Sequence, residues 1–254
     1  MTMTRRELLL PLAATLLAPS ISAREAGEEG SGKKGWCGFH PRNHETFGAN
    51  WYYTWTPDWQ SGGAIEFVPM IKTGNDVAKA ARIGANSKYL LGFNEPERKD
   101  QGNLSVDRAI ELWPELEKVA KDRGIPLGSP APSSDKQGLD WLAAFMKKAK
   151  SADLQIDFMA VHYYRSRRPD DLEDFIKEIA REYRRPVWLT EFNGWSGPER
   201  EHYDFLRKSL RFLERNRDVE RYAYFDPGAG KPHSLFTADG EPTRLGKLYQ
   251  EAGT

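Results

Sequence analysis

Eight short apolar runs recur along the chain, and helical patterns lie between the later ones. The runs are Trp36–Phe39, Ala49–Trp55, Ile65–Ile71, Tyr89–Asn94, Pro126–Ser129, Phe158–Tyr164, Val187–Glu191 and Tyr222–Phe225. Each run has the length and the apolar content of a buried strand. Strands that alternate with helices form a parallel sheet through right-handed crossovers. Eight of them favour a closed (β/α)8 TIM barrel, and so an α/β protein, over an open sheet.

Four segments carry apolar residues at helical spacing. They are residues 106–123, 139–149, 172–183 and 198–213. Pro114 is expected to kink or divide the first, Asp170 to cap the third, and Pro198 to be the first residue of the fourth. The earliest connections are too short or irregular for helices, which predicts a small, trimmed barrel in a single domain. A doubly wound sheet is the main alternative, disfavoured because no glycine-rich phosphate loop follows the first run.

Residues 1–23 have the pattern of a signal peptide. Arg5 and Arg6 precede the apolar run Leu8–Ala18, which is too short to span a bilayer, and small residues follow as far as Ala23. We expect cleavage there and a secreted or periplasmic mature protein, by the general or the twin-arginine route. The alternatives are a buried N-terminal helix or a membrane anchor. Residues 24–34 are predicted to form a flexible linker and residues 35–254 a single folded domain.

The composition excludes several classes of protein. Lys plus Arg and Asp plus Glu both number 37, and no basic block suggests a nucleic-acid partner. Cys37 is the only cysteine, so an intramolecular disulfide and a cysteine zinc site are excluded. The spacing of the five His residues matches no metal motif. We therefore expect no cofactor, no metal, no stable membrane insertion of the mature chain, and a monomer.

Two carboxylates follow strand-like runs at the end where barrel enzymes carry their chemistry. Glu95 comes directly after the fourth run, and Glu191 ends the seventh. Val187, Leu189 and Glu191 are expected to share one strand face, which predicts that Glu191 points into the barrel mouth. Pro96 stops the fourth run and favours an extended backbone at Glu95. The alternative is a pair of structural carboxylates at loop edges.

A pair of facing carboxylates is what the cleavage of a glycosidic bond requires. One must be protonated to assist the leaving oxygen, and the other must be ionised to attack the anomeric carbon or to activate water. Mutual repulsion and partial burial are expected to raise the pKa of one of them and so to separate the roles. We expect Glu95 to be the one that stays protonated.

Four motifs at the ends of these runs carry a family resemblance. They are Gly92–Glu97 (GFNEPE), Gly128–Ala131 (GSPA), His162–Tyr164 (HYY) and Leu189–Phe192 (LTEF). They resemble glycoside hydrolase family 128, which includes endo-β-1,3-glucanases and Asl1-like fungal cell-wall proteins, and the similarity runs from about residue 35 to residue 249. The resemblance implies a small retaining barrel glycosidase with Glu95 as acid/base and Glu191 as nucleophile. Glu97 stands where Asp is commoner in that family, and Tyr163 where Trp is frequent.

Three polar residues near this pair are candidate substrate-binding residues. Asn94 is placed to hydrogen-bond a sugar 2-hydroxyl or the nucleophile. His162 and Tyr164 share one face of the sixth run, beside the seventh in a barrel. Tyr164 could donate to Glu191 and keep it ionised, while His162 could orient the site. The alternatives are a strand-end amide for Asn94 and a core histidine for His162.

Aromatic residues are candidate platforms for sugar rings, because the chain has eight Trp, ten Tyr and twelve Phe. Tyr53, Trp55 and Trp195 lie near ends of the second and seventh runs, and Asn193 follows the nucleophile closely. We predict that these four residues bind substrate. Trp51 is expected to fill the core, which is also the alternative for Tyr53.

Two functions of different kinds remain open. The first is an exported, retaining endo-hydrolase whose partner is a β-1,3-glucan polysaccharide or oligosaccharide. The second is a non-catalytic β-glucan-binding cell-surface protein on the same scaffold. The presence of both Glu95 and Glu191 favours the enzyme, because a binding protein has no need for two such carboxylates.

Overall fold

One parallel sheet forms the centre of the protein. The computed structural model describes residues 31–39, 45–58, 65–194 and 197–253. Its strands are β1 (Lys34–Cys37), β2 (Trp51–Tyr53), β3 (Glu66–Phe67), β4 (Met159–Tyr163), β5 (Val187–Phe192) and β6 (Val219–Tyr224). Their order across the sheet is β3-β2-β1-β6-β5-β4, and every neighbouring pair is parallel.

The fourth and fifth predicted runs close this sheet into a barrel. They make too few ladder hydrogen bonds to count as regular strands, but isolated parallel bridges link them to each other and to both edges of the sheet. These bridges are Met70–Leu91, Leu90–Leu127, Asn94–Ala131 and Gly128–Phe158. All eight predicted runs therefore take part, and the predicted α/β barrel in a single domain is confirmed.

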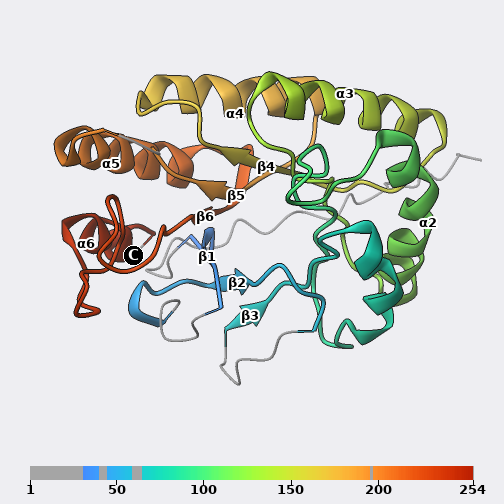
Figure 1. Ribbon diagram of the computed structural model, residues 1–254, viewed down its shortest axis with the longest axis horizontal. Coiled ribbons are helices and arrows are strands. Elements are labelled where there is room, and N and C mark those ends of the chain that lie inside the picture. Colours follow the sequence, from blue (N-terminus) through green and yellow to red (C-terminus); the bar gives the residue numbers. More distant parts are fainter. Residues whose placement is uncertain (1–30, 40–44, 59–64, 195–196, 254) are drawn as a thin grey trace, which may run out of the picture.

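Helices cover the outside of the barrel from the third strand onward (Figure 1). They are the 3-10 helix η1 (Gly74–Arg82) and the α-helices α2 (Val106–Arg123), α3 (Lys136–Ser151), α4 (Pro169–Tyr183), α5 (Glu199–Arg215) and α6 (Arg244–Glu251). Between β1 and β3, the described residues are helical only at positions 45 and 46. This is the trimmed barrel that the short early connections predict.

Three details of the helices differ from the sequence-based expectation. Pro114 does not divide α2, which is one helix in which Trp113 and Leu116 are buried, so packing offsets the hydrogen bond that proline cannot make. Asp170 lies in the first turn of α4 and not at its N-cap, because Pro169 takes the first helical position. Pro198 is the N-cap of α5, with an extended backbone, and is not its first residue.

The folded part begins slightly before the predicted domain boundary. β1 starts at Lys34, whose buried ammonium donates to the carbonyls of Tyr249 and Gln250 at the end of α6. Lys33 donates in the same way to three carbonyls at the end of α5. Cations at helix C-termini satisfy carbonyls that the helix leaves unpaired. Residues 33 and 34 are therefore structural and not linker, while the predicted signal peptide lies outside the described residues.

Aromatic rings fill the lower part of the barrel interior. Trp188 stacks on Phe158 with 4.3 Å between ring centroids and lies 5.2 Å from Trp51. The Arg221 guanidinium lies 4.5 Å from the Trp188 ring and pairs with Glu66. Trp51 is thus a core residue, as expected. Because these side chains fill the barrel at the N-terminal ends of the strands, the free space lies at the mouth formed by the C-terminal ends of the strands.

Buried tyrosines make the stability of this fold sensitive to alkali. Burial raises the pKa of Tyr163 to about 12 and raises those of Tyr53, Tyr222 and Tyr249. In the unfolded chain these phenols titrate near pH 10. Above that pH the native state therefore holds more protons than the unfolded state, and stability falls as pH rises.

We predict that the urea midpoint falls between pH 10 and pH 11, as followed by far-UV circular dichroism. The fall should be smaller for Tyr163→Phe, which removes one of the phenols whose pKa rises on folding. The burial of Lys34, whose pKa is lowered to about 8 from 10.5, acts in the opposite direction until the pH passes about 10.5. The larger number of buried phenols outweighs it in this range, and it acts equally in both variants, so the difference between the variants reports Tyr163. A midpoint that stays constant across this range contradicts the prediction.

Candidate active site

Glu191 points into the barrel because β5 carries one extra residue. Val161 on β4 pairs with Leu189, and the next residue, His162, pairs with Glu191, so Thr190 has no partner. Leu189 packs in the outer core, against the helices. The predicted common face of Leu189 and Glu191 is therefore wrong, since strict alternation would turn Glu191 outward. The bulge at Thr190 reverses the alternation and directs the carboxylate inward.

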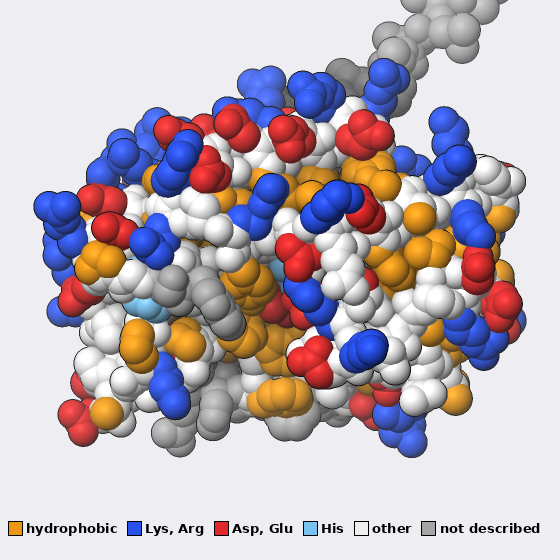
Figure 2. Space-filling model, turned by 45° about the horizontal axis from the view of Figure 1, so that its top comes forward, with side chains coloured by type: hydrophobic (Ala, Val, Ile, Leu, Met, Phe, Trp, Pro, Cys, Tyr) orange, Lys and Arg blue, Asp and Glu red, His pale blue; other side chains and the backbone are white. Residues whose placement is uncertain are grey.

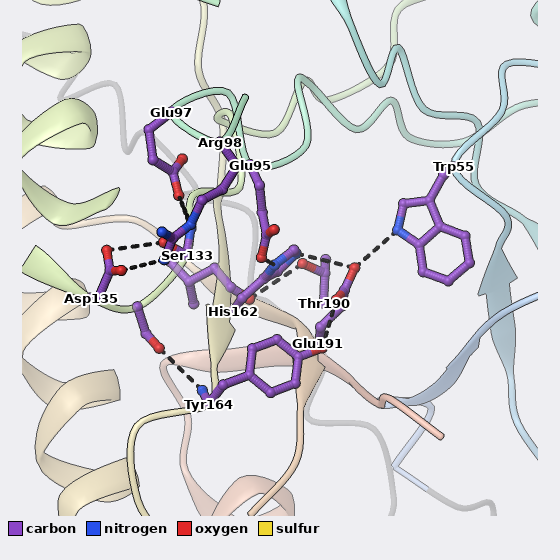
Figure 3. A network of polar contacts seen from close by, with 12 residues as sticks. Trp55, Glu95, Glu97, Arg98, Ser133, Asp135, His162, Tyr164, Thr190 and Glu191 are labelled. Carbon is purple, nitrogen blue, oxygen red and sulfur yellow. Dashed lines mark hydrogen bonds and ion pairs between the residues drawn. The ribbon is translucent and has the colours of Figure 1, made fainter. Parts of the chain in front are cut away.

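Three side chains donate hydrogen bonds to the Glu191 carboxylate, whose side chain is only 7% exposed. Figure 3 shows two of them, Tyr164 and Trp55. The Tyr164 hydroxyl donates to Oε2 at 2.6 Å. The Trp55 indole and the Tyr53 hydroxyl donate to Oε1 at 2.9 and 3.1 Å. Burial, together with the Glu191 charge, raises the pKa of both phenols well above the usual value, so they remain donors at neutral pH. The expected contact between Tyr164 and the nucleophile candidate is confirmed.

The two aromatic residues of the second run differ in what they offer a ligand. Tyr53 is fully buried, so its ring has no surface on which a sugar could stack, and its role is to donate to Glu191. Trp55 is partly exposed and lines the cavity described below. Its backbone is left-handed, with φ of 56°, which is uncommon for a large side chain and is typical of functional sites. Trp195 lies outside the described residues, and its role as a platform stays a prediction.

His162 lies between the two carboxylates and is fully buried (Figure 3). Its Nδ1 is 3.0 Å from Glu95 Oε1, and its Nε2 is 3.4 Å from Glu191 Oε1. Burial lowers the pKa of His162, but the Glu191 charge and the contact with Glu95 outweigh it, so the pKa is raised. The imidazole therefore connects the acidic groups electrostatically, as a residue that orients the site is expected to do.

Glu95 has a left-handed backbone with φ of 38°, so the extended conformation expected before Pro96 is wrong. Its carbonyl turns back to accept the N–H groups of Arg98 and Gly102, which builds a tight loop after the fourth run. An added Cβ at Gly102 would lie 2.6 Å from the Cα of Pro96. The loop therefore depends on glycine at position 102, and tertiary contacts hold Glu95 in a conformation that its own sequence disfavours.

The electrostatics of Glu95 also differ from the expectation. Burial raises its pKa, but the hydrogen bond and the charge of His162 lower it more. Arg98 and Lys72 add smaller effects in the same direction. The net result is a lowered pKa, which is opposite in direction to the raised pKa expected for the acid/base. Neighbouring basic groups, rather than repulsion from Glu191, have the larger effect on the pKa of this carboxyl.

A cavity of about 600 Å³ opens above the two carboxylates. Its lining residues are Trp55, Lys72, Asn94, Glu95, Arg98, Gln101, Ser133, Ser134, Asp135, Tyr164, Arg165, Glu191 and Phe225. Figure 2 shows a hollow with apolar walls and acidic side chains in its depth. Apolar surface beside a few polar groups suits a sugar, whose ring has C–H faces and whose edge carries hydroxyls.

The two predicted asparagines occupy different positions. Asn94 lies in the cavity wall, and its buried Oδ1 has no hydrogen-bond partner within the described residues. Asn193 is buried, donates through Nδ2 to the Phe225 carbonyl and is not among the lining residues. Its observed contact is structural, because it joins the end of β5 to the end of β6.

Several lining residues were not predicted from the sequence. Phe225 ends the eighth predicted run and Ser134 follows the fifth, so their position at strand ends was an available signal. Ser134 Oγ accepts the Tyr164 N–H and so fixes the backbone beside that donor. Arg98 and Gln101 come from the loop that turns at Glu95, and Arg98 pairs with Asp135 across the cavity wall. No sequence periodicity indicates a loop of this shape.

The described residues contain no group of three or more His, Cys, Asp and Glu side chains arranged to hold a metal ion. Over the same residues, no helix combines the length and the apolar character needed to cross a bilayer.

A family model described as "Glycosyl hydrolase catalytic core" matches residues 35–249. A curated relative, alkali-sensitive linkage protein 1 of Schizosaccharomyces pombe, is 31% identical over 219 residues, which is 80% of this chain. The chain spans about 40% of the length of that relative.

Solved structures of family GH128 are similar in both sequence and fold. An endo-β-1,3-glucanase of Amycolatopsis mediterranei, in complex with laminaritriose, is 33% identical with a TM-score of 0.76, covering 87% of this chain and 100% of that one. A curdlan-specific exo-β-1,3-glucanase of Blastomyces gilchristii, in complex with glucose, is 32% identical with a TM-score of 0.75, covering 88% and 99%. Relatives with this fold thus include both endo- and exo-acting enzymes.

We predict that Gly102→Ala destabilises the protein by about 1–3 kcal/mol, because the added methyl group collides with backbone at Pro96 and Asn94. Urea denaturation at neutral pH measures the loss. Gly84→Ala is the matched control, since its nearest contact, at 3.8 Å, is an ordinary one. Equal stability of the two variants contradicts the close packing of the loop at Gly102.

Proposed function

We propose, since this chain belongs to the glycosyl hydrolase catalytic core family and resembles GH128 β-1,3-glucanases, that it hydrolyses β-1,3-glucan by a retaining double displacement. The observation that carries the proposal is the pair formed by Glu95 and Glu191 at one cavity, with His162 in contact with both. Two carboxyl groups with different environments are what this reaction needs.

Glu191 is the nucleophile in this proposal. Its three donors, Tyr53, Trp55 and Tyr164, are neutral, so they stabilise the carboxylate without giving it a proton. They also hold the side chain in one orientation toward the cavity. The first step joins a Glu191 oxygen to the anomeric carbon and breaks the bond from that carbon to the leaving oxygen.

Glu95 is the acid/base. It gives a proton to the leaving oxygen in the first step, and in the second it takes one from the water that hydrolyses the glycosyl-enzyme. Glu95 has a lowered pKa without ligand, but its partner His162 has a raised one. In this proposal, the contact at 3.0 Å between them is the route by which a proton reaches Glu95.

The cavity wall supplies substrate contacts in this proposal. Asn94 contributes a polar side chain to the wall, while Trp55 and Phe225 offer apolar surface to the ring. A second hollow of about 540 Å³ shares Trp55 and Phe225 with the first and includes the exposed ring of Phe39. Free space that continues past Trp55 and Phe225 supports endo action, because a longer glucan chain then has room beyond the first cavity.

The alternative is a non-catalytic β-glucan-binding protein on the same scaffold. It needs the aromatic surface but not two carboxylates, one buried and one partly buried, because withdrawing charges from water is costly without a function. We also propose that the mature chain is exported, which rests on the signal-peptide pattern of residues 1–23, and that it acts as a monomer.

The wild-type protein should release reducing sugar from laminarin. Glu95→Gln should lower turnover on laminarin by about 10²–10⁴-fold, the usual contribution of a general acid. The loss should be much smaller on an aryl β-laminaribioside whose leaving group needs no proton. An equal loss on both substrates contradicts the role of Glu95, and a wild-type protein that binds laminarin without cleaving it supports the binding alternative.

The stereochemistry of the product tests the double displacement. Proton NMR of the first sugar released should show the β-anomer before mutarotation, because two inversions restore the configuration. In a complex with substrate, the two carboxyl groups should lie roughly 5–5.5 Å apart, against about 6.5–9.5 Å for an inverting enzyme. An initial α-anomer overturns the retaining mechanism.

A further inference from the structure

A third carboxylate, Glu97, is buried beside the site, and the reaction described above does not use it. Its side chain is 2% exposed, and it does not line the cavity. Oε2 of Glu97 has no hydrogen-bond partner within the described residues. Burying a carboxylate with an unsatisfied oxygen lowers stability, so its presence requires another explanation.

The hydrogen-bond ladder around Glu95 shows what Glu97 does. Along the fourth and fifth runs, the Ala131 N–H donates to the Phe93 carbonyl and the Glu95 N–H donates to the Ala131 carbonyl. A regular parallel ladder would continue with the Ser133 N–H donating to the Glu95 carbonyl. That carbonyl is not available, because the left-handed turn at Glu95 directs it to the loop that follows.

The Glu97 carboxylate replaces the missing acceptor. Its Oε1 accepts the Ser133 N–H at 2.9 Å (Figure 3). The same oxygen lies 3.5 Å from Arg98 Nε, and the Glu97 carbonyl accepts from the side chain of Gln137. Glu97 therefore joins the Glu95 loop to the neighbouring segment at the rung where the backbone turns away.

From this arrangement we propose that Glu97 is a positioning residue, which holds the Glu95 backbone in its left-handed conformation by accepting the Ser133 N–H. This rests on the proposed role of Glu95 as acid/base. Without the carboxylate, the Ser133 N–H competes for the Glu95 carbonyl, and the backbone relaxes toward the extended conformation that a residue before proline favours. The acid/base then lies out of line with the leaving oxygen.

The reach of the side chain determines which substitutions preserve the contact. Glu97→Gln keeps an acceptor oxygen at the same distance along the side chain, whereas Glu97→Asp keeps the charge but is one methylene shorter. A role through hydrogen bonding therefore predicts that Gln replaces Glu better than Asp does. A role through charge, on Arg98 or His162, predicts the reverse order.

The test compares kcat/KM on laminarin with kcat/KM on an aryl β-laminaribioside that has an activated leaving group. Glu97→Ala should lower the value on laminarin by about 10²-fold, the cost of a small misplacement of a catalytic group. The value on the aryl substrate should fall far less, because its leaving group needs no proton. Glu97→Gln should retain most of the activity on laminarin, and Glu97→Asp should not.

Glu117→Ala is the matched control. Glu117 is also buried, accepts a backbone N–H from Gln155 at 2.8 Å and pairs with Lys121, but it lies on α2, away from the cavity. The Glu117→Ala variant should be less stable but should keep the ratio of the two kcat/KM values, since unfolding removes activity on both substrates equally.

The outcomes separate this proposal from the proposed function. A wild-type protein active on both substrates, with Glu97→Ala losing both equally or neither, overturns the positioning role alone. A higher kcat/KM on laminarin for Glu97→Asp than for Glu97→Gln also overturns the positioning role. A wild-type protein inactive on both substrates overturns the proposed function, and the positioning role with it.

Discussion

The carboxylate of Glu191 is buried at the mouth of the barrel. Its burial requires hydrogen-bond donors, and the positions of these donors determine much of the arrangement of the site. A buried charge is costly unless hydrogen bonds compensate for lost water. Here the donors come from β2, from the residue two positions beyond it, and from the residue after β4. These segments must converge on one point, so the contacts that close the barrel also orient the nucleophile. Aromatic donors serve both purposes, because they are neutral hydrogen-bond donors and their rings pack in the barrel.

The second carboxylate is held in a different way, and this difference separates the roles. Glu95 makes its close contact with His162, a group that can carry a proton, and its backbone is held in a conformation that costs energy. Glu191 lies on a strand that is regular except for a single bulge, and it accepts hydrogen bonds from three neutral donors. One carboxylate is thus set up to remain an acceptor, and the other to exchange a proton with its neighbour.

The sequence predicts the architecture well because apolar patterning reports burial, and burial defines a barrel. The eight runs, the trimmed early connections and the pairing of Tyr164 with Glu191 follow from it. The inward direction of Glu191 was predicted correctly but for the wrong reason. The bulge at Thr190 depends on pairing with β4, so the sequence of β5 alone gives no signal for it. The left-handed turn at Glu95 also opposes the local preference, so only tertiary contacts through Gly102 and Glu97 explain it.

Covalent trapping of the nucleophile tests the central claim most directly. A 2-deoxy-2-fluoro-β-laminaribiosyl fluoride has a leaving group that departs without acid assistance, and its fluorine slows hydrolysis of the glycosyl-enzyme. Intact mass spectrometry should show one fluorodisaccharide added, and peptide mapping should place it on Glu191. An adduct on any other residue, or turnover of the natural glucan with inversion and no adduct, contradicts the account.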